Sequence, residues 1–374
     1  MRILVVAHAP IRDSNRPVYR ELARQGHAVT LLVPDRWKSG LGPLRVEPEI
    51  DDDGSFTLLS RRKLGRSHPA LWTVGGIGSL VRSERIEAVY VDEDPASLAA
   101  WRSAGACRRH GAALVVLAIQ NLVKRYPFPF DRISRFVIET ASAAVYTSDQ
   151  ADAVIRSRGF TRHGFSFPFT TDLEPLAPLA RAAARTRFKM DGPTFAYVGR
   201  LVPEKGVDLL LRALADVGGA RVLLVGDGPE RANLEALAQQ IGIAPRVSFT
   251  GVLPPADAAL ALAAADALVL PSRTATNWAE QFGRVLIEAM ASGVPVVASD
   301  SGAIPEVVGD AGIIVPEGSA LALGVALRRV LEPEVAEHLS VLGLQRARDL
   351  YSVRAAAGAL ATACADGASN YAER

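Results

Sequence analysis

The stretch Glu280-Gln-Phe-Gly-Arg-Val-Leu-Ile-Glu288 sets two carboxylates eight positions apart, where a loop is expected to lead into a helix over 283–292. If both glutamates were helical, a rise of about 1.5 Å per residue would separate their Cα atoms by roughly 12 Å. That distance is too long for a shared proton or for the carboxyl pair of an ordinary retaining glycosidase. It suits two carboxylates that hold separate hydroxyl-bearing ends of one long ligand, with a helix N-terminus facing an anion between them. A nucleoside diphosphate sugar has this shape.

Length and composition describe a globular chain with room for two domains. The 374 residues include 49% hydrophobic and 22% charged residues, and the formal charge of +2 gives no reason to expect a nucleic-acid partner. Cys107 and Cys364 are the two cysteines, which favours reduced thiols in a cytoplasmic protein. Residues 1–9 are too short an apolar run for a signal peptide and predict a first core strand. The oligomeric state cannot be deduced from the sequence.

Strand and helix patterns alternate through most of the chain, which predicts right-handed βαβ units and parallel sheets covered on both faces. A Pro- and Ala-rich segment at 174–192 interrupts the alternation near the midpoint and is expected to be a linker. The fold class is therefore α/β, with two Rossmann-like, doubly wound domains facing a central cleft. The usual ligand site of such domains lies at the carboxyl ends of their strands.

The segment Gly199-Arg-Leu-Val-Pro-Glu-Lys205-Gly lies between a predicted strand at 194–198 and a predicted helix at 205–217. Arg200 and Lys205 would place two fixed cations on this loop. Such cations suit a diphosphate leaving group, whose negative charge grows as the sugar departs. Taken alone, most such pairs are exposed basic loops; beside the two-glutamate stretch, the functional interpretation is favoured.

Two further turns are expected to line a nucleotide pocket. Gly226-Asp-Gly-Pro begins like a dinucleotide fingerprint but lacks its third small residue, so it is weak support for NAD and is interpreted as a tight turn. Thr250-Gly-Val252 could offer backbone groups to a base or could be a plain turn. No cofactor is expected beyond the nucleotide sugar itself.

Metal binding is not expected. Asp51-Asp-Asp53 lies in a Gly-containing turn, where a solvated loop is the simpler interpretation, whereas Asp92-Glu-Asp94 ends a strand and could contact an acceptor. His8 and His27 look structural. Gln120-Asn121 follows a buried strand and predicts a polar lip that holds hydroxyls. The basic stretches 61–63 and 108–109 leave peripheral membrane contact open without supporting it, and a solvated face is the simpler interpretation.

Four motifs together resemble the family-4 retaining glycosyltransferases with the GT-B fold. They are the Glu-x7-Glu stretch at 280–288, the Gly-Arg-Leu-x-Pro-Glu-Lys-Gly segment at 199–206, the Gly-Asp-Gly-Pro turn, and Ser-Asp-Ser-Gly-Ala-Ile-Pro-Glu at 299–306. The resemblance implies an acceptor-binding domain over 1–174 and a donor-binding domain over 175–350. It also implies a final helix over 351–374, which often packs back on the first domain in this family.

Carried over residue by residue, the resemblance implies roles for particular side chains. Arg200 and Lys205 would bind the donor diphosphate, Glu280 the sugar hydroxyls and Glu288 the ribose. The implied catalytic residues are Arg200, Lys205 and Glu280. The implied donor-binding residues are Gly199, Arg200, Lys205, Gly226, Val252, Phe282, Gly283 and Glu288, and the backbone N–H groups of Phe282 and Gly283 would meet the sugar or phosphate.

The acceptor side departs from the family pattern. Many relatives have a Gly-Gly pair after the first strand, where this chain has a loop at 9–16, and many have a histidine where this chain has Gln120-Asn121. We assign Asn15, Arg16, Gln120 and Asn121 to the acceptor side, with a small molecule, glycan or glycolipid as the acceptor.

The predicted function is metal-independent transfer of a sugar from a nucleoside diphosphate sugar to an acceptor hydroxyl with retention of configuration. The alternatives are a nucleotide-sugar epimerase of the same fold, which would need clear acid and base residues, and a non-catalytic sugar-binding protein. The nucleotide base, the sugar, the acceptor and the pathway are not determined by the sequence.

Overall fold

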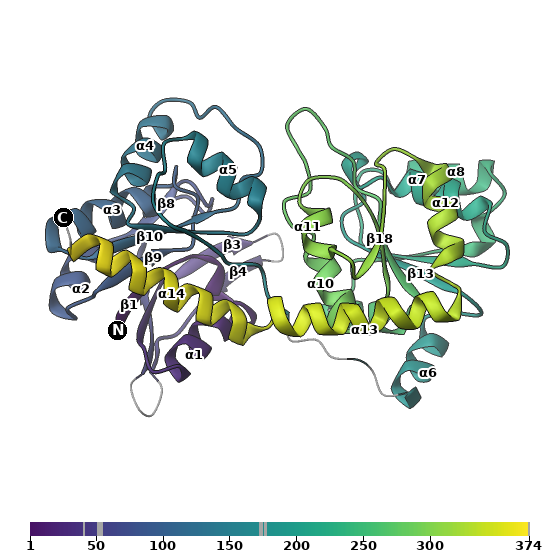
Figure 1. The fold of residues 1–374 in the computed structure, drawn as a ribbon, viewed down its shortest axis with the longest axis horizontal. Coiled ribbons are helices and arrows are strands. Elements are labelled where there is room, and N and C mark those ends of the chain that lie inside the picture. Colours follow the sequence, from purple (N-terminus) through teal and green to yellow (C-terminus); the bar gives the residue numbers. More distant parts are fainter. Residues whose placement is uncertain (40–41, 51–54, 172–174, 176–177, 373–374) are drawn as a thin grey trace. The chain divides into compact units, whose positions relative to one another are not determined.

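The computed structural model describes residues 1–39, 42–50, 55–171, 175 and 178–372, and it contains two compact units (Figure 1). Unit 1 comprises Met1–Pro168 and Val353–Arg374, and unit 2 comprises Phe169–Ser352. Each unit is built on its own sheet. The predicted α/β class with two Rossmann-like parallel sheets is confirmed.

Unit 1 contains an eight-stranded sheet in the order β12-β11-β10-β9-β1-β2-β6-β5, parallel except for the short edge strand β5. Its strands are β1 (Arg2–Val6), β2 (Ala28–Pro34), β5 (Glu49–Ile50), β6 (Phe56–Arg61), β9 (Ala88–Val91), β10 (Ala113–Ala118), β11 (Ala143–Tyr146) and β12 (Gly164–Ser166). Two hairpins are formed by β3 (Arg36–Ser39) with β4 (Gly42–Arg45) and by β7 (Lys63–Gly65) with β8 (Trp72–Val74).

Both faces of this sheet are covered by helices, as alternating apolar residues on a parallel strand require. Along β1, Leu4 and Val6 belong to one core, while Ile3 and Val5 belong to the other. The first core is closed by α2 (Ile77–Ser83), α3 (Leu98–His110), α4 (Phe130–Thr140) and α5 (Asp149–Ser157), and the second by α1 (Pro17–Arg24) and α14 (Val353–Ala372).

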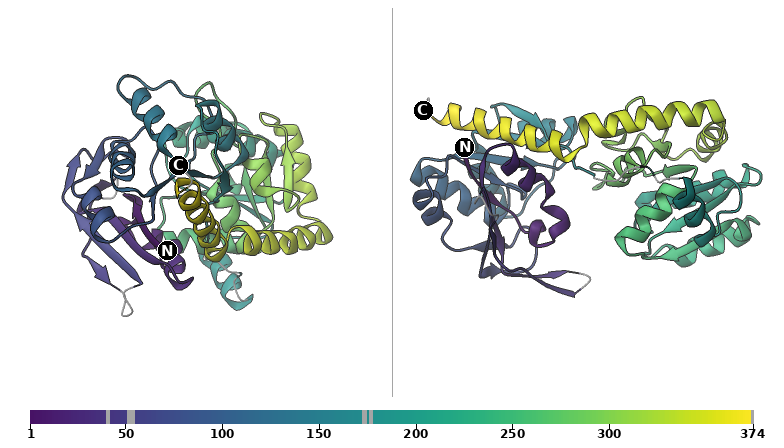
Figure 2. Two further views of the ribbon diagram at one scale, coloured as in Figure 1. Left: turned by 60° about the vertical axis from the view of Figure 1, so that its left-hand side comes forward. Right: turned by 90° about the horizontal axis from the view of Figure 1, so that it is seen from below.

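The last helix of the chain belongs to unit 1. α14 packs beside α1 and against β9 to β12, and Figure 2 shows the two helices side by side. Leu360 and Cys364 of α14 are fully buried in the second core. The small residues of this helix allow its close approach, since Gly367 lies against Val115 and Ala143.

Unit 2 contains a six-stranded parallel sheet in the order β15-β14-β13-β16-β17-β18. Its strands are β13 (Thr194–Val198), β14 (Arg221–Val225), β15 (Val247–Gly251), β16 (Ala267–Leu270), β17 (Val296–Ser299) and β18 (Gly312–Val315). Its helices are α6 (Pro178–Arg187), α7 (Val207–Ala215), α8 (Arg231–Gln240), α9 (Pro255–Ala264), α10 (Arg284–Ala291), α11 (Ile304–Val308), α12 (Ala320–Arg329) and α13 (Pro333–Leu350). The chain order reverses between β13 and β16, which is the topological switch point where ligands bind in such sheets.

One local expectation is wrong. The expected linker at 174–192 contains α6, whose Ala184 packs into a small core of unit 2 and whose Arg181 and Arg185 both pair with Asp266.

The acidic turn expected at 51–54 lies outside the described residues. Within the residues that are described, no helix is both long enough and apolar enough to span a membrane.

Candidate functional site

The two predicted cations and Glu280 lie on loops that follow two neighbouring strands at the switch point of unit 2. Gly199, Arg200 and Lys205 follow β13, and the loop that carries Glu280 follows β16 and leads into α10. In a parallel sheet the carboxyl ends of neighbouring strands share one edge, which explains how residues 75 positions apart meet.

Lys205 and Glu280 form the central contact of this edge. Lys205 Nζ lies 2.5 Å from Glu280 Oε2, and Ser272 Oγ donates to the same oxygen at 3.0 Å. Lys205 Nζ also lies 5.2 Å from the ring centroid of Trp278. Glu280 is only 7% exposed. An ammonium has three N–H donors, so Lys205 can keep this carboxylate and still donate to phosphate oxygens.

Arg200 differs from Lys205 in its surroundings. Its side chain is exposed, and the described residues provide no hydrogen-bond or ion-pair partner for it. Its backbone, however, is fixed: Tyr197, fully buried, donates its hydroxyl proton to the Arg200 carbonyl at 2.6 Å. Burial raises the pKa of Tyr197, so the phenol remains a donor at neutral pH. The backbone of Arg200 is thus fixed, and its exposed guanidinium can bind an anion.

The turn after β14 requires glycines because its backbone packs closely against another loop. A Cβ on Gly226 would come 1.9 Å from the Gly199 carbonyl oxygen, and one on Gly228 would come 2.2 Å from that of Leu201. The Gly199 and Leu201 N–H groups donate to Val225 and Asp227 at 2.9 Å. The turn therefore fixes the cationic loop. Val252 lies beyond β15 with a 72% exposed side chain.

The second carboxylate of the opening stretch lies on a helix. Gly283 is the N-cap of α10 with a φ of 77°, a conformation that suits glycine, and Glu288 lies in the second turn of this helix, half-buried. Phe282 is buried and packs edge-to-face on Phe169 and Tyr351. The N–H groups of Phe282 and Gly283 meet no acceptor within the described parts of the chain. Glu280 lies before the helix, so the two glutamates are not on one helix.

In unit 1, polar residues follow the adjacent strands β1, β9 and β10. They are His8 after β1, Asp92 to Asp94 after β9, and Gln120-Asn121 after β10. Asp92 is half-buried and accepts a hydrogen bond from Tyr19 at 2.7 Å. No group of three or more His, Cys, Asp or Glu residues that could hold a metal occurs in the described parts of the chain.

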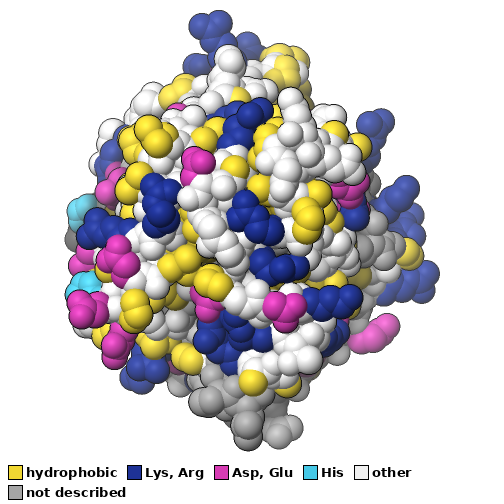
Figure 3. Space-filling view, turned by 90° about the vertical axis from the view of Figure 1, so that its right-hand side faces the viewer, with side chains coloured by type: hydrophobic (Ala, Val, Ile, Leu, Met, Phe, Trp, Pro, Cys, Tyr) yellow, Lys and Arg dark blue, Asp and Glu magenta, His cyan; other side chains and the backbone are white. Residues whose placement is uncertain are grey.

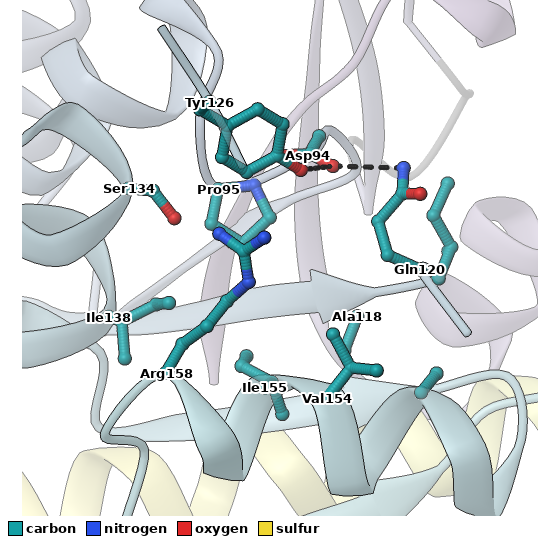
Figure 4. A pocket seen from close by; sticks show the side chains of 12 residues that line it. Asp94, Pro95, Ala118, Gln120, Tyr126, Ser134, Ile138, Val154, Ile155 and Arg158 are labelled. Carbon is teal, nitrogen blue, oxygen red and sulfur yellow. Dashed lines mark hydrogen bonds between the residues drawn. The ribbon is translucent and has the colours of Figure 1, made fainter. Parts of the chain in front are cut away.

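Asp94 and Gln120 line a small pocket of about 20 Å³ (Figure 4). Asp94 accepts hydrogen bonds from Gln120 Nε2 at 3.1 Å and from the Tyr126 hydroxyl at 2.9 Å. The Arg158 guanidinium lies 4.5 Å from the Tyr126 ring centroid. Gln120 Oε1 is buried and has no partner among the described residues, which leaves an acceptor atom for a hydroxyl. Asn121 is 8% exposed and has a partner of its own.

The other two predicted acceptor residues support their own loop. Asn15 Nδ2 donates to the Ala9 carbonyl at 2.9 Å. Arg16 is 8% exposed, donates to the Pro10 carbonyl and pairs with Glu49 at 3.0 Å. Both side chains are used to hold the loop at 9–16.

His8 takes part in a buried cluster that the sequence did not reveal. Its Nδ1 lies 2.5 Å from Glu93 Oε1, and its ring stacks on Trp37 at a centroid distance of 4.4 Å. Trp72 donates to the same Glu93 oxygen at 3.1 Å. Burial raises the pKa of Glu93 to about 7. The sequence does contain a sign of this cluster, since a histidine and an acidic run each follow a predicted strand. Only the strand order, however, shows that these two strands are neighbours.

Comparison with known proteins finds a family that is similar to part of this chain. Residues 181–343, all within unit 2, match the family model "Glycosyl transferases group 1". The second unit is thus similar to the glycosyl transferases group 1, and the solved structures described below share the GT-B fold of the chain.

The similarity to curated relatives covers only part of each protein. The chain is 37% identical over 180 residues to the GDP-mannose-dependent alpha-(1-6)-phosphatidylinositol monomannoside mannosyltransferase of Mycobacterium tuberculosis, a match that covers 43% of this chain and 47% of the relative. It is 39% identical over 212 residues to the D-inositol 3-phosphate glycosyltransferase of Mycobacteroides abscessus, which covers 52% and 46%. The chain thus spans about half the length of these relatives.

Solved structures match the fold over nearly the whole chain. The Anabaena protein HepE in complex with UDP has a TM-score of 0.72 at 19% identity, covering 97% of this chain and 99% of that one. Sucrose-phosphate synthase from Thermosynechococcus elongatus has a TM-score of 0.69 at 22% identity, covering 97% and 98%.

Proposed function

We propose that this protein is a retaining glycosyltransferase that moves a sugar from a nucleoside diphosphate sugar to an acceptor hydroxyl. The observation that carries the proposal is the half-buried Lys205–Glu280 pair beside the unpaired Arg200, at the switch point of unit 2. Two cations on a fixed loop suit a diphosphate, and a carboxylate beside them suits sugar hydroxyls.

The proposed roles follow from the contacts. Arg200 and Lys205 bind the diphosphate and stabilise the charge that develops on it as the glycosidic bond breaks. Glu280 and the N–H groups of Phe282 and Gly283 hold the sugar, and Glu288 accepts from the ribose hydroxyls. The acceptor attacks the same face of the sugar from which the diphosphate leaves, and its proton passes to the departing phosphate oxygen. No protein base and no metal are needed in this scheme.

On the acceptor side we propose that Gln120 and Asn121 hold hydroxyls. The unpaired Gln120 Oε1 beside Asp94 supports this role. For Asn15 and Arg16, the contacts favour an indirect role in shaping the loop at 9–16. The names of the curated relatives make GDP-mannose the first donor to test and inositol-bearing compounds the first acceptors.

We also propose a reducing, cytoplasmic location, because Cys107 and Cys364 are free, buried thiols.

A thermal-shift screen of UDP-, GDP-, ADP- and TDP-sugars tests the donor half of the proposal. A specific donor should raise Tm by mass action, and the shift should persist in EDTA. The anomeric configuration of the product, read by NMR, tests retention. Loss of activity in EDTA that Mg²⁺ restores would overturn metal independence.

An epimerase is the second candidate, because the His8–Glu93 pair supplies an acid and base with a carboxyl pKa of about 7. Incubating the stabilising nucleotide sugar without an acceptor separates the two functions. An epimerised nucleotide sugar would favour this candidate; an unchanged sugar that is transferred once an acceptor is added would support the transferase.

A further inference from the structure

A second cavity in unit 1 is lined by cations and by small residues. α2 and α3 pack against each other (Figure 1). An open groove of about 470 Å³ lies along them. Its lining residues are Gly76, Ile77, Gly78, Ser79, Arg82, Arg102, Gly105, Ala106, Arg109 and His110. No carboxylate is among these lining residues.

The three arginines of the groove are not neutralised by the protein. Arg82 on α2 and Arg102 and Arg109 on α3 are exposed, and none has an ion-pair or hydrogen-bond partner within the described residues. Residues seven apart lie two turns apart on one face of a helix, so Arg102 and Arg109 point to the same side of α3. Like charges gathered in one concave site repel each other and attract an anion.

A fourth arginine, Arg61, lies at the N-terminal end of α2. Arg61 Nη1 donates to the Gly75 carbonyl at 3.3 Å, and a Cβ on Gly76 would come 1.9 Å from that nitrogen. Arg61 of the basic stretch at 61–63 thus lies beside Gly76 of the groove, and Arg109 of the stretch at 108–109 lines it. Figure 3 shows a different face, on which Lys and Arg side chains are mixed with Asp and Glu.

Gly105 is an independent sign of function. It lies inside α3, three residues after Arg102 and four before Arg109, and so between them on the groove face. Glycine weakens a helix interior relative to alanine. Nothing lies within 4 Å of the position that its Cβ would take, so the packing of the fold does not require glycine here. An open backbone between two unpaired cations suits the close approach of a ligand.

We propose that the groove between α2 and α3 binds a phosphate group through Arg82, Arg102 and Arg109. Planar guanidinium groups recognise phosphate oxygens through paired hydrogen bonds. The phosphate can belong to a soluble compound or to a lipid headgroup, because both present the same anionic oxygens. This site is separate from the loops of unit 2 and does not depend on the proposed transferase activity.

The test measures binding of inorganic pyrophosphate to the full chain by calorimetry at low salt. Because the donor site of unit 2 also attracts phosphate, the titration is made in the Lys205→Ala background. The Arg102→Gln/Arg109→Gln variant should weaken pyrophosphate binding at least about tenfold, since each lost charged hydrogen bond is worth about that factor. The matched control is Arg329→Gln/Arg348→Gln, which removes two exposed arginines of unit 2 and should leave the affinity unchanged.

Two glycine variants distinguish an effect on phosphate binding in the groove from an effect on helix stability. Gly105→Ala and Gly358→Ala each fill an empty position inside a helix, and each should raise Tm by about 1–3 °C. Only Gly105→Ala should weaken phosphate binding.

Co-sedimentation with phosphatidylcholine vesicles that contain or lack phosphatidylglycerol distinguishes the two sources. Arginine-dependent binding of the anionic vesicles alone assigns the phosphate to a lipid; arginine-dependent pyrophosphate binding assigns it to a soluble compound. Unchanged binding of both probes in Arg102→Gln/Arg109→Gln and in Gly105→Ala would overturn the proposal.

Discussion

At the scale of single residues, the ion pair of Lys205 and Glu280 is the feature on which the functional account depends. Its 2.5 Å contact joins the loop after β13 to the loop after β16, and Ser272 fixes the carboxylate from a third direction. A cation held in this way needs little reorganisation when charge develops on a leaving diphosphate, which is the condition for electrostatic catalysis.

Removing either proposed phosphate-binding cation should slow the reaction strongly. For Lys205→Ala and Arg200→Ala we expect kcat/KM to fall about 30- to 1000-fold, or about 2–4 kcal/mol of transition-state stabilisation. The measurement is steady-state transfer with the donor found by thermal shift. Arg212→Ala, which removes an exposed cation from α7 of the same unit, is the control and should retain full activity. Wild-type rates in both cation variants would refute the assignment.

The burial of Glu93 should make stability depend on pH. The folded pKa of Glu93 is about 7, whereas the ordinary value is 4.5, so the folded protein holds this proton more tightly than the unfolded chain. The stabilisation is therefore complete below about pH 4.5 and is lost as the pH rises through 7.

Relative to Glu93→Gln, the free energy of unfolding of the wild type should fall by up to about 3 kcal/mol between these limits. Urea unfolding at a series of pH values measures the difference, with Glu84→Gln, an exposed carboxyl, as the control. A difference between wild type and Glu93→Gln that stays constant across this range would contradict the shift.

At the scale of elements, glycines let the donor loops lie against one another. Gly302, in the run at 299–306, has a φ of 57°, and a Cβ there would come 2.2 Å from the Glu280 carbonyl oxygen. Ala303 N–H donates to the same oxygen at 2.9 Å. The segment after β17 thus holds the backbone of Glu280 in place.

Gly302→Ala should displace Glu280, and Gly318→Ala provides the matched control. Both glycines have a positive φ, but nothing lies within 4 Å of a Cβ on Gly318. Gly318→Ala should cost about 1 kcal/mol of stability from backbone strain alone. Gly302→Ala should cost more and should also weaken donor binding, as urea unfolding and calorimetry would measure. Equal effects in the two variants would show that the contact with Glu280 is unimportant.

Much of the element order follows from the sequence, because buried parallel strands are short apolar runs separated by amphipathic helices. β13 and α10 were predicted within a few residues of their observed limits. The hairpins of unit 1 and α6 were not predicted: short β7 and β8 have no distinct pattern, and the prolines at 175 and 178 suggested a linker.

The candidate site could be predicted only in part, because its residues carry different kinds of signal. Arg200, Lys205, Glu280 and Glu288 stand in recognisable motifs, so their identity was available from the sequence. The ion pair of Lys205 with Glu280, the Glu93 cluster and the arginine groove depend on strand order and helix packing. These contacts join residues far apart in the sequence, so no local sequence pattern predicts them.

At the scale of the whole molecule, each unit has its own hydrophobic core and should lose stability separately. Leu360 is fully buried in unit 1 and Leu268 in unit 2. Leu→Ala at either position should cost about 2–5 kcal/mol. Hydrogen exchange should show faster exchange in unit 1 for Leu360→Ala and in unit 2 for Leu268→Ala. Equal acceleration in both units would contradict two separate cores.

The central claim is that the loops after β13 and β16 bind the diphosphate of a nucleotide. Calorimetric titration of wild type, Lys205→Ala and Arg212→Ala with GDP and with UDP tests it most directly. We predict that one nucleotide binds the wild type and Arg212→Ala with the same affinity and binds Lys205→Ala at least about tenfold more weakly, the factor expected for a lost charged hydrogen bond. Equal affinity of that nucleotide for all three proteins would contradict the account.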